Sequence, residues 1–259
     1  MAKIRSLPEM ISSTARDKLA TAPARQTPDN TAEKPRTAIL DALKFIESAI
    51  ASDGYAFSAT SMKFSKKQGD FTYEISFQCD RNNAAGQRAA VWTHTLVHSR
   101  ICTTWSRRHS SDWIRPATSF QPAIFVSQLG YLCKPAGWME WDFADHTKRH
   151  PVAGDLIACI REGAYPLFAT FEAGADKIAQ LIDRGLTSPE PILRYLLSAG
   201  HHDLAKRSFN RYLQERPDLQ VEFQRLRMEF ETKGIPGYRS GEAHNLAGFA
   251  VATGFPWST

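Results

Sequence analysis

The chain has 259 residues, of which 42% are hydrophobic, so it can bury a sizeable core as one large domain or as a domain with an appended subdomain. Its 32 basic and 27 acidic residues leave a net charge of +5, which permits an acidic partner without requiring one. No apolar run approaches the roughly 20 residues that a membrane-spanning helix requires. The start, Met1 to Pro8, lacks the apolar core of a secretory signal.

The cysteines are widely separated along the chain and form no Cys-x-x-Cys pair. They are Cys79, Cys102, Cys133 and Cys159. This spacing is typical neither of a zinc knuckle nor of a small disulfide scaffold. We therefore expect reduced thiols and a cytoplasmic location. Because the sequence has no membrane-spanning apolar run, no phosphate loop and no Gly-x-Gly-x-x-Gly motif, we also expect no membrane contact and no bound cofactor.

The first elements differ sharply in composition. Residues 1–36 are interrupted by prolines and hold few large apolar side chains, which predicts a flexible arm. From Thr37 to Ser52, apolar residues recur at helical spacing of three and four, and Gly54 is suited to ending this helix. The apolar positions of this helix are Ile39, Leu43, Ile46 and Ile50.

The segment Phe71–Cys79 alternates apolar and polar residues without a break. Because successive side chains of a strand point to opposite faces, Phe71, Tyr73, Ile75, Phe77 and Cys79 are predicted to line one face. The other face is polar. The pattern favours a half-buried strand in an antiparallel sheet that has one wet side.

Other segments rich in β-branched and aromatic residues predict further strands. They are Ala56–Lys67, Ala90–Ile101, Ile101–Trp105 and Ala123–Leu132. The turn Lys67–Asp70 contains Gly69, which supports a tight hairpin into the alternating strand.

The second half of the chain has helical periodicity. A helix over Asp155–Phe171 is expected to be interrupted at Gly163 and Pro166, because proline removes a backbone donor. Shorter helices are predicted over residues 178–185, 189–200, 203–215 and 219–233. Ser188, just before the 189–200 helix, and Pro189, in its first turn, form a start signal of a cap followed by proline. In the tail, Phe249, Phe255 and Trp257 are expected to dock on the body.

Strands grouped between helices, without strict alternation, indicate an α+β fold. We expect an antiparallel sheet of four to five strands, packed on one face by the 37–52 and 155–171 helices and followed by a C-terminal helical appendage. The expected boundaries are an arm (1–36), the α+β domain (37–175), a helical subdomain (176–236) and a tail (237–259).

Several segments, taken together in this order, resemble a known family. They are Gly54-Tyr55-Ala56-Phe57, Gly69-Asp70-Phe71, the Trp-containing stretch Trp138–Phe143, and Ala164-Tyr165-Pro166-Leu167-Phe168. The order resembles a bacterial family catalogued as a domain of unknown function, number 4304, over roughly residues 37–215. The resemblance implies a non-enzymatic binding role as an immunity or defence-associated protein, with a toxin or effector as the partner.

The densest ionisable cluster is a candidate metal site. His146 and His150 are four residues apart, so a helix would place both on one face, and Asp142 or Asp145 would add a carboxylate. This favours a metal-dependent enzyme as an alternative function. Against it, Pro151 disfavours helical geometry at His150, and a solvated polar loop explains the same residues.

The segment Trp105–Arg115 interleaves aromatic and basic side chains. Its candidate binding residues are Trp105, Arg107, Arg108, Trp113 and Arg115. Such residues dominate protein interfaces, a solvated loop would also carry them, and the same mixture suits single-stranded nucleic acid. We predict an exposed loop that contacts a partner protein. Nucleic acid is the less favoured alternative, since no recognised nucleic-acid-binding motif accompanies the segment. Motifs of nucleophilic catalysis are absent from the sequence, which also favours a non-enzymatic role.

Overall fold

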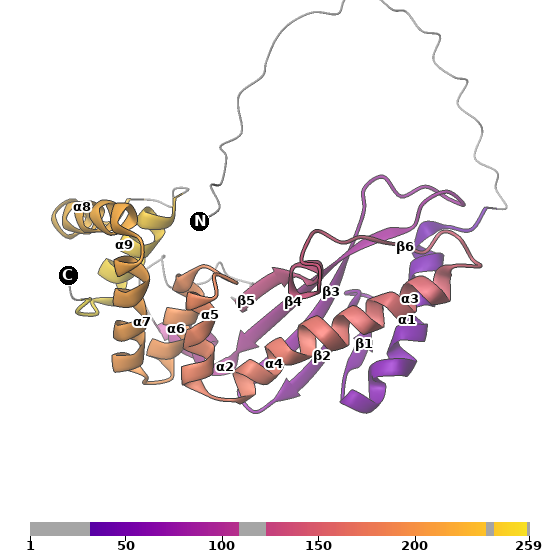
Figure 1. Ribbon diagram of the computed structural model, residues 1–259, viewed down its shortest axis with the longest axis horizontal. Coiled ribbons are helices and arrows are strands. Elements are labelled where there is room, and N and C mark those ends of the chain that lie inside the picture. Colours follow the sequence, from indigo (N-terminus) through magenta and orange to yellow (C-terminus); the bar gives the residue numbers. More distant parts are fainter. Residues whose placement is uncertain (1–31, 109–122, 237–240, 258–259) are drawn as a thin grey trace, which may run out of the picture. The chain divides into compact units, whose positions relative to one another are not determined.

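The computed structural model describes residues 32–108, 123–236 and 241–257. The described residues from Glu33 onward belong to one compact unit, which contains a sheet, a helical layer on one of its faces and a set of C-terminal helices (Figure 1). The fold is α+β, as the sequence predicts.

The sheet is antiparallel throughout the described strands. Its order follows the chain: β1 (Ala56–Ser58), β2 (Lys63–Gln68), β3 (Phe71–Cys79), β4 (Ala90–Ser99) and β5 (Ala123–Gln128). A short β6 (Trp141–Asp142) pairs with β4 beside this path. The single strand that we predicted over Ala56–Lys67 is wrong. The chain turns between β1 and β2, where the Met62 backbone has a left-handed φ of 47°.

One face of the sheet is covered by helices. α1 (Pro35–Ile50), which leads into the 3-10 turn η1 (Ala51–Asp53), packs beside α3 (Arg149–Cys159). Figure 1 shows α3 and α4 (Tyr165–Glu172) running across the strands. The inward residues of β3, Phe71 to Phe77 in alternation, are buried under this layer, which confirms the predicted one-sided burial. Cys79, which we expected on the same buried face, is exposed at the strand end.

The interruption predicted near Gly163 and Pro166 is a π-helical turn. This turn, η3 (Ile160–Ala164), joins α3 to α4, and the Tyr165 N–H donates to the Ile160 carbonyl. Gly163 lies against Leu132, where a Cβ atom would come within 3.1 Å of the Leu132 Cβ. The wider turn and the glycine therefore let the helix pass close to the segment that follows β5.

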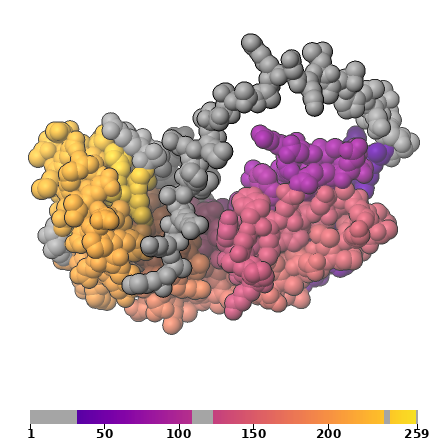
Figure 2. Space-filling view, turned by 45° about the horizontal axis from the view of Figure 1, so that its top comes forward, coloured from indigo at the N-terminus to yellow at the C-terminus, as the bar shows by residue number. Residues whose placement is uncertain are grey.

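The C-terminal helices pack on one another. They are α5 (Ala175–Asp183), α6 (Pro189–Ser198), α7 (His202–Gln214), α8 (Pro217–Lys233) and α9 (Glu242–Thr253). In Figure 2 the last of them, coloured orange to yellow, gather at one side of the molecule. Ser188 precedes α6 as predicted, but its side chain forms no capping hydrogen bond.

The end of the chain docks on these helices. The Trp257 side chain is 2% exposed, and its ring lies 4.7 Å from that of Phe209. Phe249 is buried and Phe255 is partly buried against the same core, so the predicted docking is confirmed. We did not predict the helix α9, because its Gly- and Ala-rich sequence gives little apolar periodicity.

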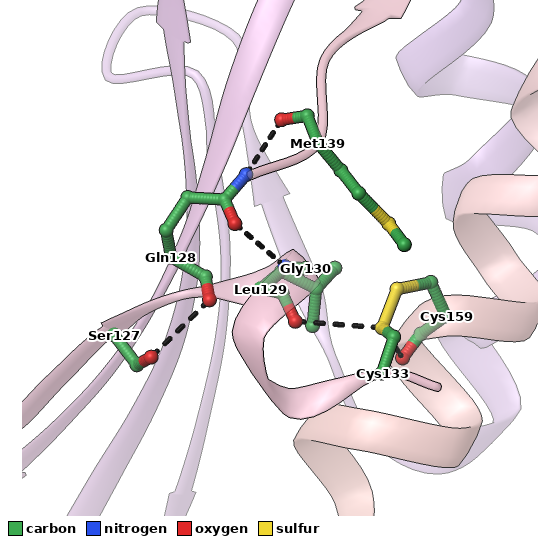
Figure 3. Close-up of a disulfide and its surroundings, with 7 residues drawn as sticks. All are labelled: Ser127, Gln128, Leu129, Gly130, Cys133, Met139 and Cys159. Atoms are coloured by element: carbon green, nitrogen blue, oxygen red, sulfur yellow. Dashed lines mark hydrogen bonds between the residues drawn. A yellow bond between two sulfur atoms is a disulfide. The ribbon is translucent and has the colours of Figure 1, made fainter. Parts of the chain in front are cut away.

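A disulfide joins Cys133 to Cys159 (Figure 3). Cys133 follows the 3-10 turn η2 (Leu129–Leu132), and Cys159 ends α3, so the bond ties the segment after β5 to the helical layer. Beside it, the Gln128 side chain accepts the Gly130 N–H and donates to the Met139 carbonyl. Our expectation of reduced cysteines is wrong for this pair, because the fold brings together two residues that are distant in sequence. Cys79 and Cys102 are free.

A buried arginine anchors the start of the folded unit. Arg149 is 3% exposed, and its guanidinium donates to the Phe143 carbonyl at 3.0 Å and to Asp41 at 3.0 Å. It also pairs with Glu33, whose carbonyl accepts the Gly86 N–H. Glu33, which precedes α1, is therefore part of the packed structure.

Within the described residues, no helix is both long enough and apolar enough to cross a membrane.

Candidate functional site

Helix α2 (Arg100–Arg108) follows β4 directly, and two side chains hold its first turn. Ser99 Oγ accepts the Cys102 N–H at 3.0 Å, which is the hydrogen bond of a helix N-cap. Asp70, in the β2–β3 turn, accepts the Ile101 N–H at 2.8 Å through its side chain and the Arg100 N–H through its carbonyl. The hairpin thus fixes where α2 begins and how it is rotated.

This helix corrects two of our predictions. The expected strand over Ile101–Trp105 does not form, and the expected loop from Trp105 onward is helical up to Arg108. The buried positions of α2 are Cys102, Thr103 and Ser106. Because these side chains are small and partly polar, they leave no apolar periodicity in the sequence, and the β-branched residues that suggested a strand are in a helix.

The buried side of α2 packs against α6 and β4. Burial raises the pKa of the Cys102 thiol to about 11. At neutral pH this thiol is therefore protonated, and it is not poised as a nucleophile. The inner side of the helix has a packing role.

The outer side of α2 carries basic and apolar groups. We define the α2 face by these side chains: Arg100, Ile101, Thr104, Trp105, Arg107 and Arg108. Ile101 is 41% exposed, whereas Trp105 is half-buried and packs against the hydrophobic core. The prediction that Trp105 lies in an exposed loop is therefore wrong, although Trp105 lines a hollow on this face.

A hollow of about 240 Å³ lies on the α2 face beside the end of α6. It is lined by Arg100, Ile101, Thr104, Trp105, Arg108 and Ser198, with no carboxylate among them. Arg100, Arg107 and Arg108 form no ion pair with any residue that the structure describes. The site is thus an apolar hollow between guanidinium groups that are not neutralised by described residues.

The structure brings together only part of the predicted binding segment. Trp105 and Arg108 line the hollow, and Arg107 lies next to it on the α2 face. Trp113 and Arg115 lie outside the described residues. We missed Arg100 and Thr104, although with Arg108 they recur every four residues and would share one face of a helix.

The candidate metal residues do not converge. Asp142 accepts hydrogen bonds from two backbone N–H groups, and Asp145 is bonded to the turn that follows it. The His150 ring stacks on Phe45 with a centroid distance of 4.5 Å, while His146 is exposed. Among the residues that the structure describes, no group of three or more His, Cys, Asp or Glu side chains could hold a metal ion. This arrangement gives no support to a metal-dependent enzyme centred on these residues.

A second aromatic patch lies on the sheet face opposite the helices. The Trp92 indole N–H donates to Glu140 at 3.0 Å, and the Trp92 ring meets that of Trp138 edge-on at 5.4 Å. Trp138 is 54% exposed. Glu140 also pairs with Arg88, so the carboxylate beside these two rings already has a cationic partner.

Comparison of the chain with family models, with curated proteins and with solved structures finds no match. The resemblance to the domain of unknown function stays a prediction.

Proposed function

We propose that this protein is a non-enzymatic protein-binding module that holds an acidic segment of a partner on the α2 face. The observation that carries the proposal is the hollow between Arg100 and Arg108, which combines an apolar floor with cations that have no carboxylate partner among the described residues. Arginine and tryptophan are the residue types most enriched among the energetically dominant positions of protein interfaces.

Charge supports an acidic partner. The sequence of α2 contains three arginines and no aspartate or glutamate. Guanidinium groups bind carboxylates through paired hydrogen bonds, and at this partly apolar surface such bonds would be shielded from bulk water. A partner with one or two carboxylates near its anchor would supply the missing counter-charges.

The size of the hollow supports a single side-chain anchor. A volume of about 240 Å³ is below that of most small-molecule pockets and suits one leucine- or phenylalanine-sized group beside Ile101 and Trp105. The partner segment is therefore expected to present an apolar residue flanked by aspartate or glutamate. A toxin or effector is the class of partner that the family resemblance implies.

Capture from a lysate of the native host tests this proposal. Immobilised wild-type protein is compared with Arg100→Ala/Arg108→Ala, and with the control Arg225→Ala/Lys233→Ala on α8. We expect at least one captured protein that is lost with the Arg100→Ala/Arg108→Ala variant and retained with the control. Its binding to the purified wild-type protein should weaken as the salt concentration is raised, because salt screens the attraction between charges. Identical captured sets would contradict the proposal.

The same experiment separates the nucleic-acid alternative. If nuclease treatment removes the captured material, and purified oligonucleotides bind with a steep loss of affinity in added salt, the partner is nucleic acid and the protein-binding proposal is wrong.

A further inference from the structure

A second hollow, of about 290 Å³, opens between η1, β2 and α4 on the helix-covered side of the sheet. Its lining residues are Asp53, Tyr55, Lys66, Tyr165, Phe168 and Glu172, with Ala169. The rings of Tyr55 and Tyr165 are stacked with centroids 5.6 Å apart and planes 3° apart. The hollow therefore has an aromatic wall and two carboxylates.

Lys66 occupies an unexpected place in this hollow. It alternates with buried Phe64 and pairs with Tyr73 across β2 and β3, so it lies on the face that elsewhere is apolar. Its ammonium lies 5.8 Å from the centroid of the Tyr55 ring and forms no ion pair with a described residue. The chain's own lysine thus shows that the aromatic wall accepts a cation.

The charges of the lining do not balance. Asp53 accepts the Tyr165 hydroxyl at 2.8 Å, but neither Asp53 nor Glu172 forms an ion pair with a residue that the structure describes. Two carboxylates and one ammonium leave one net negative charge in the lining. The nearby guanidinium of Arg161 donates to a backbone carbonyl of α1 and is not part of the lining.

A buried hydroxyl lies beside these groups. Tyr73 is 0% exposed, and its hydroxyl forms no hydrogen bond of normal geometry with a described residue. Burial raises the Tyr73 pKa, and the negative charge of Glu172 raises it further. Tyr73 also stacks on Phe168 at 4.6 Å, so its ring supports the wall of the hollow.

We propose that this hollow binds an organic cation, an alkylammonium or guanidinium group, with its charge at Asp53 and Glu172 and its stem on Tyr55 and Tyr165. Aromatic faces attract such cations, and carboxylates supply the counter-charge and hydrogen bonds. The volume suits one side-chain-sized group. The site is separate from the α2 face, so it does not rest on the function proposed for that face.

Isothermal titration calorimetry of the full chain tests this with n-butylguanidinium and with its neutral analogue n-butylurea. We expect saturable binding of one cation per chain and at least roughly tenfold weaker binding of the urea, because the analogue lacks the charge. The peptide acetyl-Gly-Gly-Arg-Gly-Gly-amide distinguishes the source of the cation. If the peptide binds, the natural ligand of the hollow is an arginine side chain of a partner. If only n-butylguanidinium binds, the natural ligand is a small molecule.

Paired variants locate the binding. Glu172→Gln, at an exposed position, is expected to weaken n-butylguanidinium binding roughly fivefold, while the control Glu162→Gln leaves it unchanged. Lys66→Met is expected to strengthen binding because it removes the competing ammonium, and the control Lys67→Met, on the opposite face of β2, is expected to have no effect.

Equal binding of the urea, or an unchanged affinity in Glu172→Gln, would overturn the proposal. Weaker binding in a folded Lys66→Met variant would also overturn it, since Lys66 would then help to hold the ligand. If Lys66→Met does not fold, the result with Glu172→Gln decides.

Discussion

The Asp70 carboxylate, in the turn between β2 and β3, accepts the backbone N–H of Ile101 in the first turn of α2 at 2.8 Å. The two residues are far apart in sequence, yet this bond connects the tip of a hairpin with the helix that carries the candidate binding face. The orientation of Arg100 and Arg108 therefore depends on a carboxylate that does not line their hollow.

Removing this carboxylate should loosen the start of α2. Asp70→Ala is expected to lower the free energy of unfolding by about 1–2 kcal/mol, the usual cost of losing a helix cap. Asp70→Asn keeps one oxygen acceptor and should cost less. Denaturant unfolding followed by circular dichroism measures both. Equal stability of wild type and Asp70→Ala would mean that Ser99 alone holds the helix start.

Adjacent arginines give a matched test of the α2 hollow. Arg108 lines it and Arg107 does not, although both are exposed at the end of the same helix. Once a partner is identified, Arg108→Ala should weaken binding about tenfold, and Arg107→Ala by no more than about twofold. Both variants should melt at the wild-type temperature. Equal losses of affinity in the two variants would indicate that the arginines act through general charge attraction and that the partner does not bind in the hollow.

Arg149 should contribute strongly to stability. Arg149→Met leaves the Phe143 carbonyl and two carboxylates without their donor, and we expect a loss of about 2–3 kcal/mol. This is below the cost for a fully buried pair, because Glu33 and Asp41 are 38% and 52% exposed and can regain water. The neighbouring control Lys148→Met, whose side chain is 75% exposed, should change stability by less than about 0.5 kcal/mol. Thermal and chemical unfolding compare the two.

Buried tyrosines should make the fold sensitive to alkali. The pKa of Tyr195 and the pKa of Tyr212 are both raised to about 12, mainly by burial, and in Tyr212 the hydrogen bond to Glu242 contributes to the shift. The stability that such a shift contributes is fully present below pH 10, which is about the pKa of tyrosine in the unfolded chain. It is lost as the pH rises from there toward the folded-state pKa of about 12.

Unfolding free energies measured between pH 9 and 11.5 check this expectation. Tyr212→Phe should make the decline with pH less steep, whereas Tyr131→Phe, at a side chain that is 51% exposed, serves as the control. A decline that is the same in Tyr212→Phe and wild type would contradict the assignment.

The sheet could be predicted because its signal is local and strong. In β3 the alternation of large apolar and polar side chains matches the burial of Phe71, Tyr73, Ile75 and Phe77. The same one-sided pattern predicted that helices would pack on this apolar face. Of the five residues predicted to line the buried face, only Cys79, at the end of the strand, is exposed.

The candidate sites could be predicted only in part, because tertiary contacts create them. α2 is a short helix that buries small residues, and its start depends on Asp70 from a distant turn. The second hollow, of about 290 Å³, joins Tyr55 before β1 with Lys66 of β2 and Tyr165 of α4, and no motif links them in sequence. The disulfide likewise joins cysteines separated by 26 positions, whose proximity only the fold supplies.

The anchoring of Glu33 changes where the protein can be shortened. Composition places the start of the domain at Thr37, but α1 begins at Pro35 and Glu33 pairs with Arg149 while its carbonyl accepts the Gly86 N–H. A truncation after residue 36 would remove a partner of the buried guanidinium along with the first residues of the helix. A truncated version for crystallisation or binding assays should therefore keep Glu33, so that any loss of function can be assigned to the residues removed and not to a weakened core.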